Sequence, residues 1–242
     1  RRALRVFNEK TNTRGISRKD AFDIKYLDQF QAEEIQYIGN LSVNNSCFYR
    51  EYVLGEDSPE MRATSMIISQ ALQQPFFTEM RTNQQLGYIV WSYARNRDET
   101  HYLTFVIQSG AFTADDVNQR ADDFIATTPE FLSSMDGETF QQLKDSAIEQ
   151  LEKKPMSIGE RANKLKAFIF EYDADFLRDE KTIVALKALE QVSAVDLLSK
   201  TVGTDSRRMA NFLMFAEQHK NATGMKSSFK DVNSWKASRS YK

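Results

Sequence analysis

Two residues that could stabilise negative charge, Arg81 and Tyr88, flank a predicted junction between a helix and a strand. Both side chains donate hydrogen bonds, and neither is expected to lose its proton at neutral pH. Such a pair can hold a carbonyl group or an oxyanion, but it cannot work as an acid–base couple. No other segment of the sequence suggests chemistry as directly.

Cysteine and histidine chemistry finds little support in the sequence. The single cysteine, Cys47, excludes an internal disulfide and a cysteine-based zinc site. It lies in an alternating apolar run, and we predict an inert strand cysteine because a catalytic thiol needs a nearby histidine and an electropositive setting. His101 and His219 begin neither His-x-x-Glu-His nor His-Glu-x-x-His, so a self-contained zinc peptidase site is excluded. His101 lies at the start of the second strand of a predicted hairpin, and we predict a surface or hairpin histidine.

Composition is typical of a globular protein. The 242 residues could form one large domain or two small ones, and 41% of them are hydrophobic, enough for a substantial core. A net charge of -2 gives no reason to expect nucleic acid as a partner. No apolar run approaches the roughly 18–20 residues that span a bilayer, so no membrane span is expected.

Arg81 and Tyr88 must be positioned by a helix that precedes them and strands that follow. Ser58 as N-cap and Pro59 as first helical residue predict a helix that runs to about Met80. Alternating patterns predict strands over residues 34–39, 46–54, 87–96, 100–109 and 208–216, with a hairpin between the third and the fourth.

The segment between the last two strands is predicted to be helical. A helix starts at Thr113 and continues in kinked form beyond Pro129, and another runs from Asp136 to about Lys154. The capping-box spacings Ser157–Glu160 and Ser193–Asp196 predict two further helix starts. This order indicates an α+β fold, with one antiparallel or mixed sheet and helices packed on one face.

Three regions are predicted along the chain. Residues 1–33 are polar and basic and indicate a linker or the end of a preceding domain; a basic arm for nucleic acid is the alternative. Residues 34–218 form the α+β domain, and residues 219–242 form a polar, basic tail. The chain begins Arg1-Arg2-Ala3 without an initiator methionine, which is typical of a fragment or a processed product.

The sequence from Asn44 to about Ala216 resembles the C-terminal, non-catalytic domain of the pitrilysin and insulin-degrading enzyme family, the inverzincin metallopeptidases. The resemblance is carried by Arg81-Thr82-x-x-Gln85-Leu86-Gly87-Tyr88-Ile89-Val90, followed by Phe105-Val106-Ile107-Gln108-Ser109.

The resemblance implies a zinc-free domain that closes a peptide chamber together with an N-terminal catalytic half. It places zinc, the His-x-x-Glu-His motif and the general base in that half, so no metal ligand and no catalytic residue falls in this chain. Arg81 and Tyr88 match the family residues that reach the substrate backbone or the oxyanion, so a peptide substrate is the expected partner. Related enzymes leave the compartment open between bacterial periplasm and cytoplasm.

Other interpretations remain open from the sequence. Arg81 could cap a helix C-terminus while Tyr88 packs at the start of a strand, with Gly87 allowing a tight turn and Gln85 ordering it. The domain could also be a scaffold or assembly domain of the same fold without a peptidase role, or a free-standing peptide-binding module.

Overall fold

The computed structural model describes residues 33–97, 99–219 and 224–239. The predicted linker, apart from residue 33, therefore lies outside the described residues. The chain divides into two compact units, of which the larger contains residues 33–154 and 177–235 and the smaller contains residues 155–176 and those from 236 onward. The predicted site lies in the larger unit.

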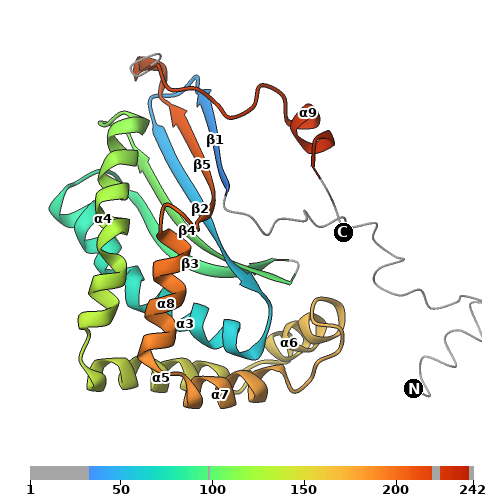
Figure 1. Cartoon of the computed structure of the whole chain (residues 1–242). Coiled ribbons are helices and arrows are strands. Elements are labelled where there is room, and N and C mark those ends of the chain that lie inside the picture. Colours follow the sequence, from blue (N-terminus) through green and yellow to red (C-terminus); the bar gives the residue numbers. More distant parts are fainter. Residues whose placement is uncertain (1–32, 98, 220–223, 240–242) are drawn as a thin grey trace, which may run out of the picture. The chain divides into compact units, whose positions relative to one another are not determined.

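A five-stranded mixed sheet forms the centre of the larger unit, in the order β1-β5-β2-β4-β3 (Figure 1). The strands are β1 (Glu33–Asn40), β2 (Ser46–Glu56), β3 (Ile89–Arg97), β4 (Thr100–Ser109) and β5 (Arg208–Phe215). β1 runs parallel to β5, and every other neighbouring pair is antiparallel. All five predicted strands are present, and the predicted α+β fold is confirmed.

The two faces of the sheet differ in what covers them. In β2, Phe48, Tyr52 and Leu54 are buried, and they alternate with half-buried residues such as Tyr49 and Val53. Because side chains of a strand alternate between faces, the buried set lies on one side. Helices α3, α4 and α8 pack on that side (Figure 1). We call the opposite side the open face.

The helices begin largely where their capping residues predict. They are α3 (Pro59–Phe77), α4 (Ala114–Ser134), α5 (Gly137–Glu152), α6 (Ile158–Phe170), α7 (Arg178–Ala188), α8 (Gln191–Val202) and α9 (Val232–Ala237), with a short 3-10 turn η2 (Glu217–His219). The side chains of Ser58, Thr113, Asp136 and Ser157 each accept a hydrogen bond from a backbone N–H of the first turn. α4 continues through Pro129, as expected.

One predicted helix start is wrong. Ser193 lies inside α8, which begins two residues earlier with Glu190 as its N-cap and no side-chain capping bond. The N–H of Ser193 donates to the backbone oxygen of Glu190 (3.2 Å), so this residue is already part of the first turn. α7 had no capping signal in the sequence, because its N-cap position is Leu177.

Aromatic packing ties the helix layer to the sheet. Phe76 of α3 is fully buried, and its ring meets Phe105 of β4 (5.0 Å between centroids) and Phe124 of α4 (5.3 Å) in edge-on contacts. Such contacts contribute beyond the burial of their area. The end of α3, from which the candidate site starts, is thereby fixed against both layers.

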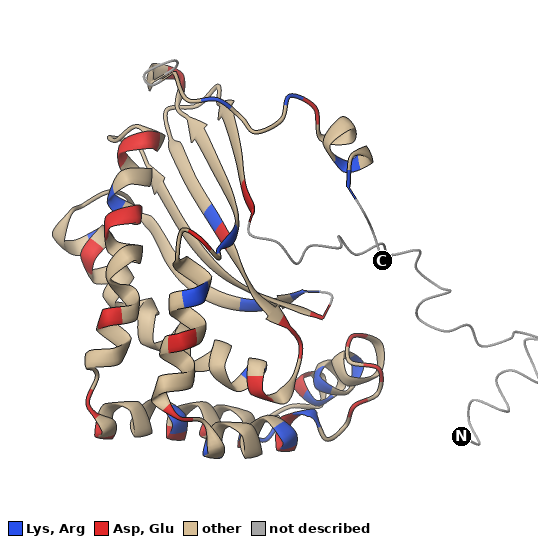
Figure 2. Ribbon diagram, viewed as in Figure 1, with Lys and Arg blue, Asp and Glu red and all other residues tan. Residues whose placement is uncertain are grey.

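One charged residue, Arg50 of β2, is buried on the helix-covered face with 2% exposure. Its guanidinium donates to Asp122, to Asn118 (2.7 Å) and to Asn211 (3.3 Å). Burial alone would lower the pKa of Arg50, but Tyr52 and Asp122 raise it above the usual value, so the residue stays charged. Elsewhere the charged positions lie mainly on helices and loops (Figure 2).

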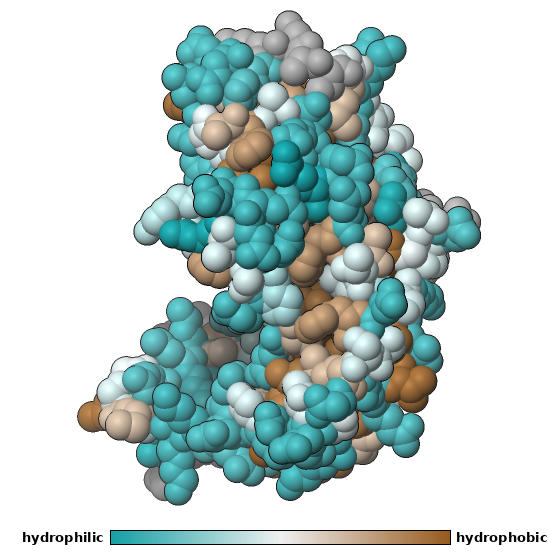
Figure 3. All heavy atoms as spheres, turned by 90° about the vertical axis from the view of Figure 1, so that its left-hand side faces the viewer, coloured by the Kyte–Doolittle hydropathy of each residue, from teal (hydrophilic) through white to brown (hydrophobic). Residues whose placement is uncertain are grey.

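Hydrophobic residues that reach the surface are scattered over the helices. Val184 of α7 and Val192 of α8 are exposed, at 68% and 56%. The face drawn in Figure 3 is mainly hydrophilic, with hydrophobic side chains in patches between hydrophilic ones. In the smaller unit, Phe168 of α6 meets Phe176 edge-on at 6.0 Å.

Residues 226–229 of the predicted tail lie along the outer edge of β1. The backbone N–H groups of Gln36 and Ile38 donate to the hydroxyls of Ser228 and Ser227, both at 2.8 Å. The Ser228 N–H donates in return to the backbone oxygen of Gln36 (2.7 Å). Side-chain hydroxyls here take the place of a sixth strand.

Candidate functional site

The helical path of α3 continues without a break into a π-helix, η1 (Thr78–Asn83), which carries Arg81. Its wider turn closes with the N–H of Gln84 bonded to the oxygen of Glu79 (3.0 Å) and the N–H of Leu86 bonded to that of Met80 (2.9 Å). Pi-helical turns occur often at functional sites. The predicted end near Met80 thus corresponds to a change of helix type, and the chain leaves the helix after Asn83.

A reversal of the backbone then brings the chain to β3. Gln85 has a φ of 53°, in the left-handed region, and Gly87 follows at a point of close approach to β4. A Cβ atom on Gly87 would lie 1.8 Å from the backbone oxygen of Gln108, so no larger residue fits without a shift. The predicted geometric role of Gly87 therefore has a concrete cause.

Hydrogen bonds between polar side chains stabilise this connection. The carboxylate of Glu79 accepts from Asn83 Nδ2 (2.7 Å) and Gln84 Nε2 (2.8 Å), and these bonds lower the pKa of Glu79. Arg120 of α4 donates to Gln84 Oε1 (3.2 Å) and to Asp116 (3.0 Å). Gln84 therefore joins η1 to α4. Gln85 contributes to the turn through its left-handed backbone conformation.

Arg81 and Tyr88 are in direct contact. The Arg81 Nη1 group donates to the backbone oxygen of Tyr88, and its guanidinium carbon lies 4.5 Å from the centroid of the Tyr88 ring. The same guanidinium lies 5.3 Å from the centroid of Phe77. Arg81 is thus held between two aromatic rings, and it holds Tyr88 by both its backbone and its ring.

The Tyr88 side chain is 80% exposed. It therefore does not pack at the start of the strand, which was the alternative interpretation. Its ring is supported by Arg81 while its phenol group faces outward. Within the described parts of the chain, no hydrogen bond occupies the phenol oxygen. The arrangement can present one oriented O–H donor to a bound molecule, with a fixed positive charge beside it.

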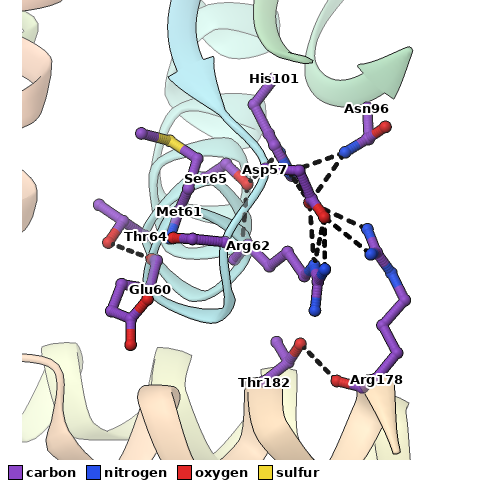
Figure 4. Close-up of polar contacts among 11 residues, drawn as sticks. Asp57, Glu60, Met61, Arg62, Thr64, Ser65, Asn96, His101, Arg178 and Thr182 are labelled. Carbon is purple, nitrogen blue, oxygen red and sulfur yellow. Dashed lines mark hydrogen bonds and ion pairs between the residues drawn. The ribbon is translucent and has the colours of Figure 1, made fainter. Parts of the chain in front are cut away.

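A second polar cluster surrounds Asp57, in the loop before α3 (Figure 4). Its carboxylate accepts from Arg62, from Arg178 of α7 (2.8 and 3.0 Å) and from Asn96 (3.0 Å), and it lies 2.8 Å from His101 Nε2. Burial alone would raise the pKa of Asp57, but hydrogen bonds from His101, Arg62 and Arg178 outweigh it and hold the pKa far below its usual range. The cluster joins the hairpin, α3 and α7.

His101 lies in the hairpin strand β4, which agrees with a hairpin histidine, but it is not a surface residue, since it is 5% exposed. Its Nδ1 lies 3.0 Å from the hydroxyl of Ser65 in α3, while its Nε2 faces Asp57. Serine, histidine and aspartate therefore stand in line, as in a hydrolase triad. Ser65 is 3% exposed and also donates to the backbone oxygen of Arg62 (3.0 Å), so it cannot meet a substrate. The Ser65–His101–Asp57 arrangement therefore has a structural role.

Comparison with known proteins identifies sequences similar to this chain. Residues 67–166 match a family model described as "PQQ synthase PqqF-like, C-terminal lobe domain 4". Insulin-degrading enzyme of Drosophila melanogaster is 26% identical over 183 residues, which cover 74% of this chain and 18% of the fly protein. Both matches support a C-terminal domain of the pitrilysin and insulin-degrading enzyme family.

Solved structures share the fold. The crystal structure of pitrilysin superimposes with a TM-score of 0.84 at 19% identity, over 98% of this chain and 26% of that one. A structure described as a "peptidase M16 inactive domain" from Pseudomonas fluorescens gives a TM-score of 0.56 at 17% identity, over 76% of this chain and 43% of that one. The chain spans less than a fifth of the fly relative and corresponds to a domain of the family's C-terminal lobe.

Likeness to this family gives reason to look for a metal site. In residues 33–97, 99–219 and 224–239, no group of three or more His, Cys, Asp or Glu side chains could hold a metal ion. The described residues therefore do not fit zinc. Cys47 lies half-buried in β2, and burial raises the pKa of its thiol, which disfavours the reactive thiolate. None of the described helices is long and apolar enough to cross a membrane.

Proposed function

We propose that the chain is the zinc-free, substrate-binding domain of a zinc metalloendopeptidase. In this function it closes a peptide chamber against an N-terminal catalytic half, and it contributes Arg81 and Tyr88 to substrate binding. Zinc and the general base belong to that half. The chain by itself then neither binds catalytic zinc nor cuts peptides.

The observation that carries the proposal is the exposed but braced phenol of Tyr88. A donor that stabilises a transition state must point to the place where charge develops and must already be oriented there. Arg81 supplies the orientation, because its guanidinium contacts both the backbone oxygen and the ring of Tyr88. Hydrolysis of a peptide bond places negative charge on the carbonyl oxygen, and the Tyr88 O–H can donate to it.

Tyr88→Phe tests the proposal in a complex of this chain with the zinc-bearing half of its parent protein. Turnover of a peptide substrate should fall about a hundredfold, as expected for loss of one oxyanion donor. Thermal unfolding should be unchanged, because the phenol oxygen makes no hydrogen bond with the described residues. Tyr172→Phe, in the smaller unit, is the matched control. Full activity of Tyr88→Phe would exclude the transition-state role.

A scaffold or assembly domain is the second candidate, favoured by the likeness to a structure whose title calls it an inactive domain. The two candidates differ in one result. A scaffold predicts that the complex with the other half has no peptidase activity at all, with or without the Tyr88 phenol. A peptidase domain predicts that the complex is active and that its activity depends on the Tyr88 phenol.

A further inference from the structure

The open face of the sheet carries a row of side chains that crosses all five strands, aromatic on four of them and a valine on β4. The strand register places Tyr37, Phe212, Tyr49, Val106 and Trp91 side by side, one from each of β1, β5, β2, β4 and β3. Neighbouring strands lie about 4.8 Å apart, so the row is about 19 Å long. We call this set the aromatic row.

The aromatic row is ordered at one end and exposed at the other. Tyr49 meets Phe212 edge-on at 5.8 Å, and Phe212 lies 6.2 Å from Tyr37. Trp91, on the edge strand β3, is 58% exposed. Tyr88, at 80% exposure, lies three residues before it on the same segment. Trp91, at the exposed end of the row, is therefore close in sequence to the proposed substrate-contact site.

Two arginines lie beside the aromatic row on β3. Arg95 donates to Glu51 Oε2 (3.2 Å, through Nε) and to the Tyr49 hydroxyl (2.7 Å), and Arg97 donates to Glu51 Oε1 (3.0 Å). Burial alone would raise the pKa of Glu51, but hydrogen bonds from Tyr49 and Arg95 lower it, so Glu51 is a carboxylate.

This cluster has one more positive charge than negative. The side chain of Glu51 is 10% exposed, whereas those of Arg95 and Arg97 are 37% and 50% exposed. The carboxylate thus lies beneath the two guanidinium groups, which face outward. The guanidinium carbon of Arg97 lies 4.5 Å from the centroid of the Tyr102 ring, which supports this group. A guanidinium has five N–H donors, and the bonds to Glu51 and Tyr49 use only some of them.

We propose that Arg95 and Arg97 bind the acidic side chain of an extended peptide whose apolar side chain packs on Trp91. The inference rests on the proposed function and names the class of peptide that the domain favours. Trp91 and Arg95 are four residues apart on one strand, or about 13 Å. An extended peptide that follows β3 therefore places an aromatic residue and a carboxylate about four residues apart.

Peptide binding to the intact chain tests the inference. In a Trp235→Phe background, Trp91 is the one remaining tryptophan of the sequence, so its fluorescence reports on this surface. Two short, end-capped peptides carry Phe and, four residues later, either Glu or Gln. We expect the Glu peptide to bind about fivefold more tightly at low salt, the size of a partly exposed charge-assisted contact, and the difference to shrink as salt is added.

Two variants should move the affinity in opposite directions, which a folding defect cannot do. Arg97→Gln removes a half-exposed charge and should abolish the preference for Glu. Glu51→Gln releases both guanidinium groups and should strengthen binding of the Glu peptide. Lys200→Gln on α8, in the helix layer, is the matched loss of one charge and should change neither affinity.

Equal binding of the two peptides by the Trp235→Phe chain would overturn the carboxylate site. Failure of both peptides to change Trp91 fluorescence would overturn the whole docking surface. Neither result bears on Tyr88, whose role is decided by turnover in the reassembled enzyme. The two proposals can therefore fail separately.

Discussion

Arg81 and Tyr88, which are in contact, have different roles in the candidate site. The guanidinium of Arg81 is committed to the rings of Phe77 and Tyr88 and to a backbone oxygen, so its main effect is to orient its neighbour. The phenol of Tyr88 is the group that remains available to a ligand. Arginine suits this position because its planar cation stacks on aromatic faces, which a lysine ammonium does less well.

Asp57→Asn should change how stability depends on pH. The folded-state pKa of Asp57 lies far below the unfolded value of about 3.9, so the folded protein binds fewer protons between these two values. The contribution of Asp57 is therefore complete above about pH 5, and it is lost as pH falls below the unfolded pKa. We expect the variant to be about 3 kcal/mol less stable at pH 7, because two arginines lose their counter-charge.

Urea unfolding at a series of pH values measures this effect. The wild-type chain should lose stability steadily from about pH 5 downward, and Asp57→Asn should lose less over the same range. Asp196→Asn, at an exposed position on α8, is the control and should follow the wild type. If the unfolding free energies of the wild type and of Asp57→Asn fell equally as pH decreased, the lowered pKa assigned to Asp57 would be contradicted.

At the scale of elements, the junction between η1 and β3 depends on close backbone approach. Gly87→Ala would place a Cβ atom 1.8 Å from the backbone oxygen of Gln108. We expect a loss of about 3 kcal/mol in unfolding free energy, since β4 backbone cannot move aside as a flexible side chain can. Gly137→Ala is the matched control, because nothing lies within 4 Å of its Cβ position.

The two glycine variants are compared by thermal unfolding. Gly137→Ala, in the first turn of α5, should leave the melting temperature unchanged or raise it slightly, since alanine favours helix. A Gly87→Ala chain as stable as Gly137→Ala would show that the junction is more open than the geometry indicates. In the reassembled enzyme, Gly87→Ala should also lower turnover by displacing Tyr88.

Local signals explain what could be predicted from the sequence. Alternation located the strands, and Ser58 followed by Pro59 located the start of α3. The burial of His101 depends on Asp57 and Ser65, which lie 44 and 36 residues away. No pattern in a single sequence reports such contacts, and the same holds for Arg50 with its partners on α4 and β5. The sequence could place Arg81 and Tyr88 at one junction, but not show that one holds the other.

The larger unit, which contains the sheet, has a structural side and an accessible side. On the helix-covered face, Arg50 joins β2 to α4, and in the loop before α3, Asp57 joins α3 to α7. The opposite face presents Trp91 and the outward guanidinium groups of Arg95 and Arg97. Ligand binding by this domain is accordingly expected on the open face and at the Tyr88 junction, where polar groups remain accessible.

Deleting the residues after His219 should expose the outer edge of β1. The deletion removes Ser227 and Ser228, whose hydroxyls accept from the backbone N–H groups of that strand, and Phe229, whose ring stacks on Tyr37 at 5.9 Å. An edge strand with unpaired backbone groups pairs with other chains. We expect the shortened chain to be about 2–3 kcal/mol less stable, at about 1 kcal/mol per hydrogen bond, and to self-associate as its concentration rises.

Light scattering coupled to size-exclusion chromatography distinguishes the cause. A chain that ends at Trp235 keeps the residues that contact β1 and should remain in the state of the full chain. Ser227→Ala combined with Ser228→Ala keeps Phe229 but loses the hydroxyl acceptors, so its stability and association should be intermediate. If the chain that ends at His219 did not associate, water would be satisfying the N–H groups of β1 in that chain. The serine hydroxyls of the full chain would then stabilise β1 without shielding its edge from other chains.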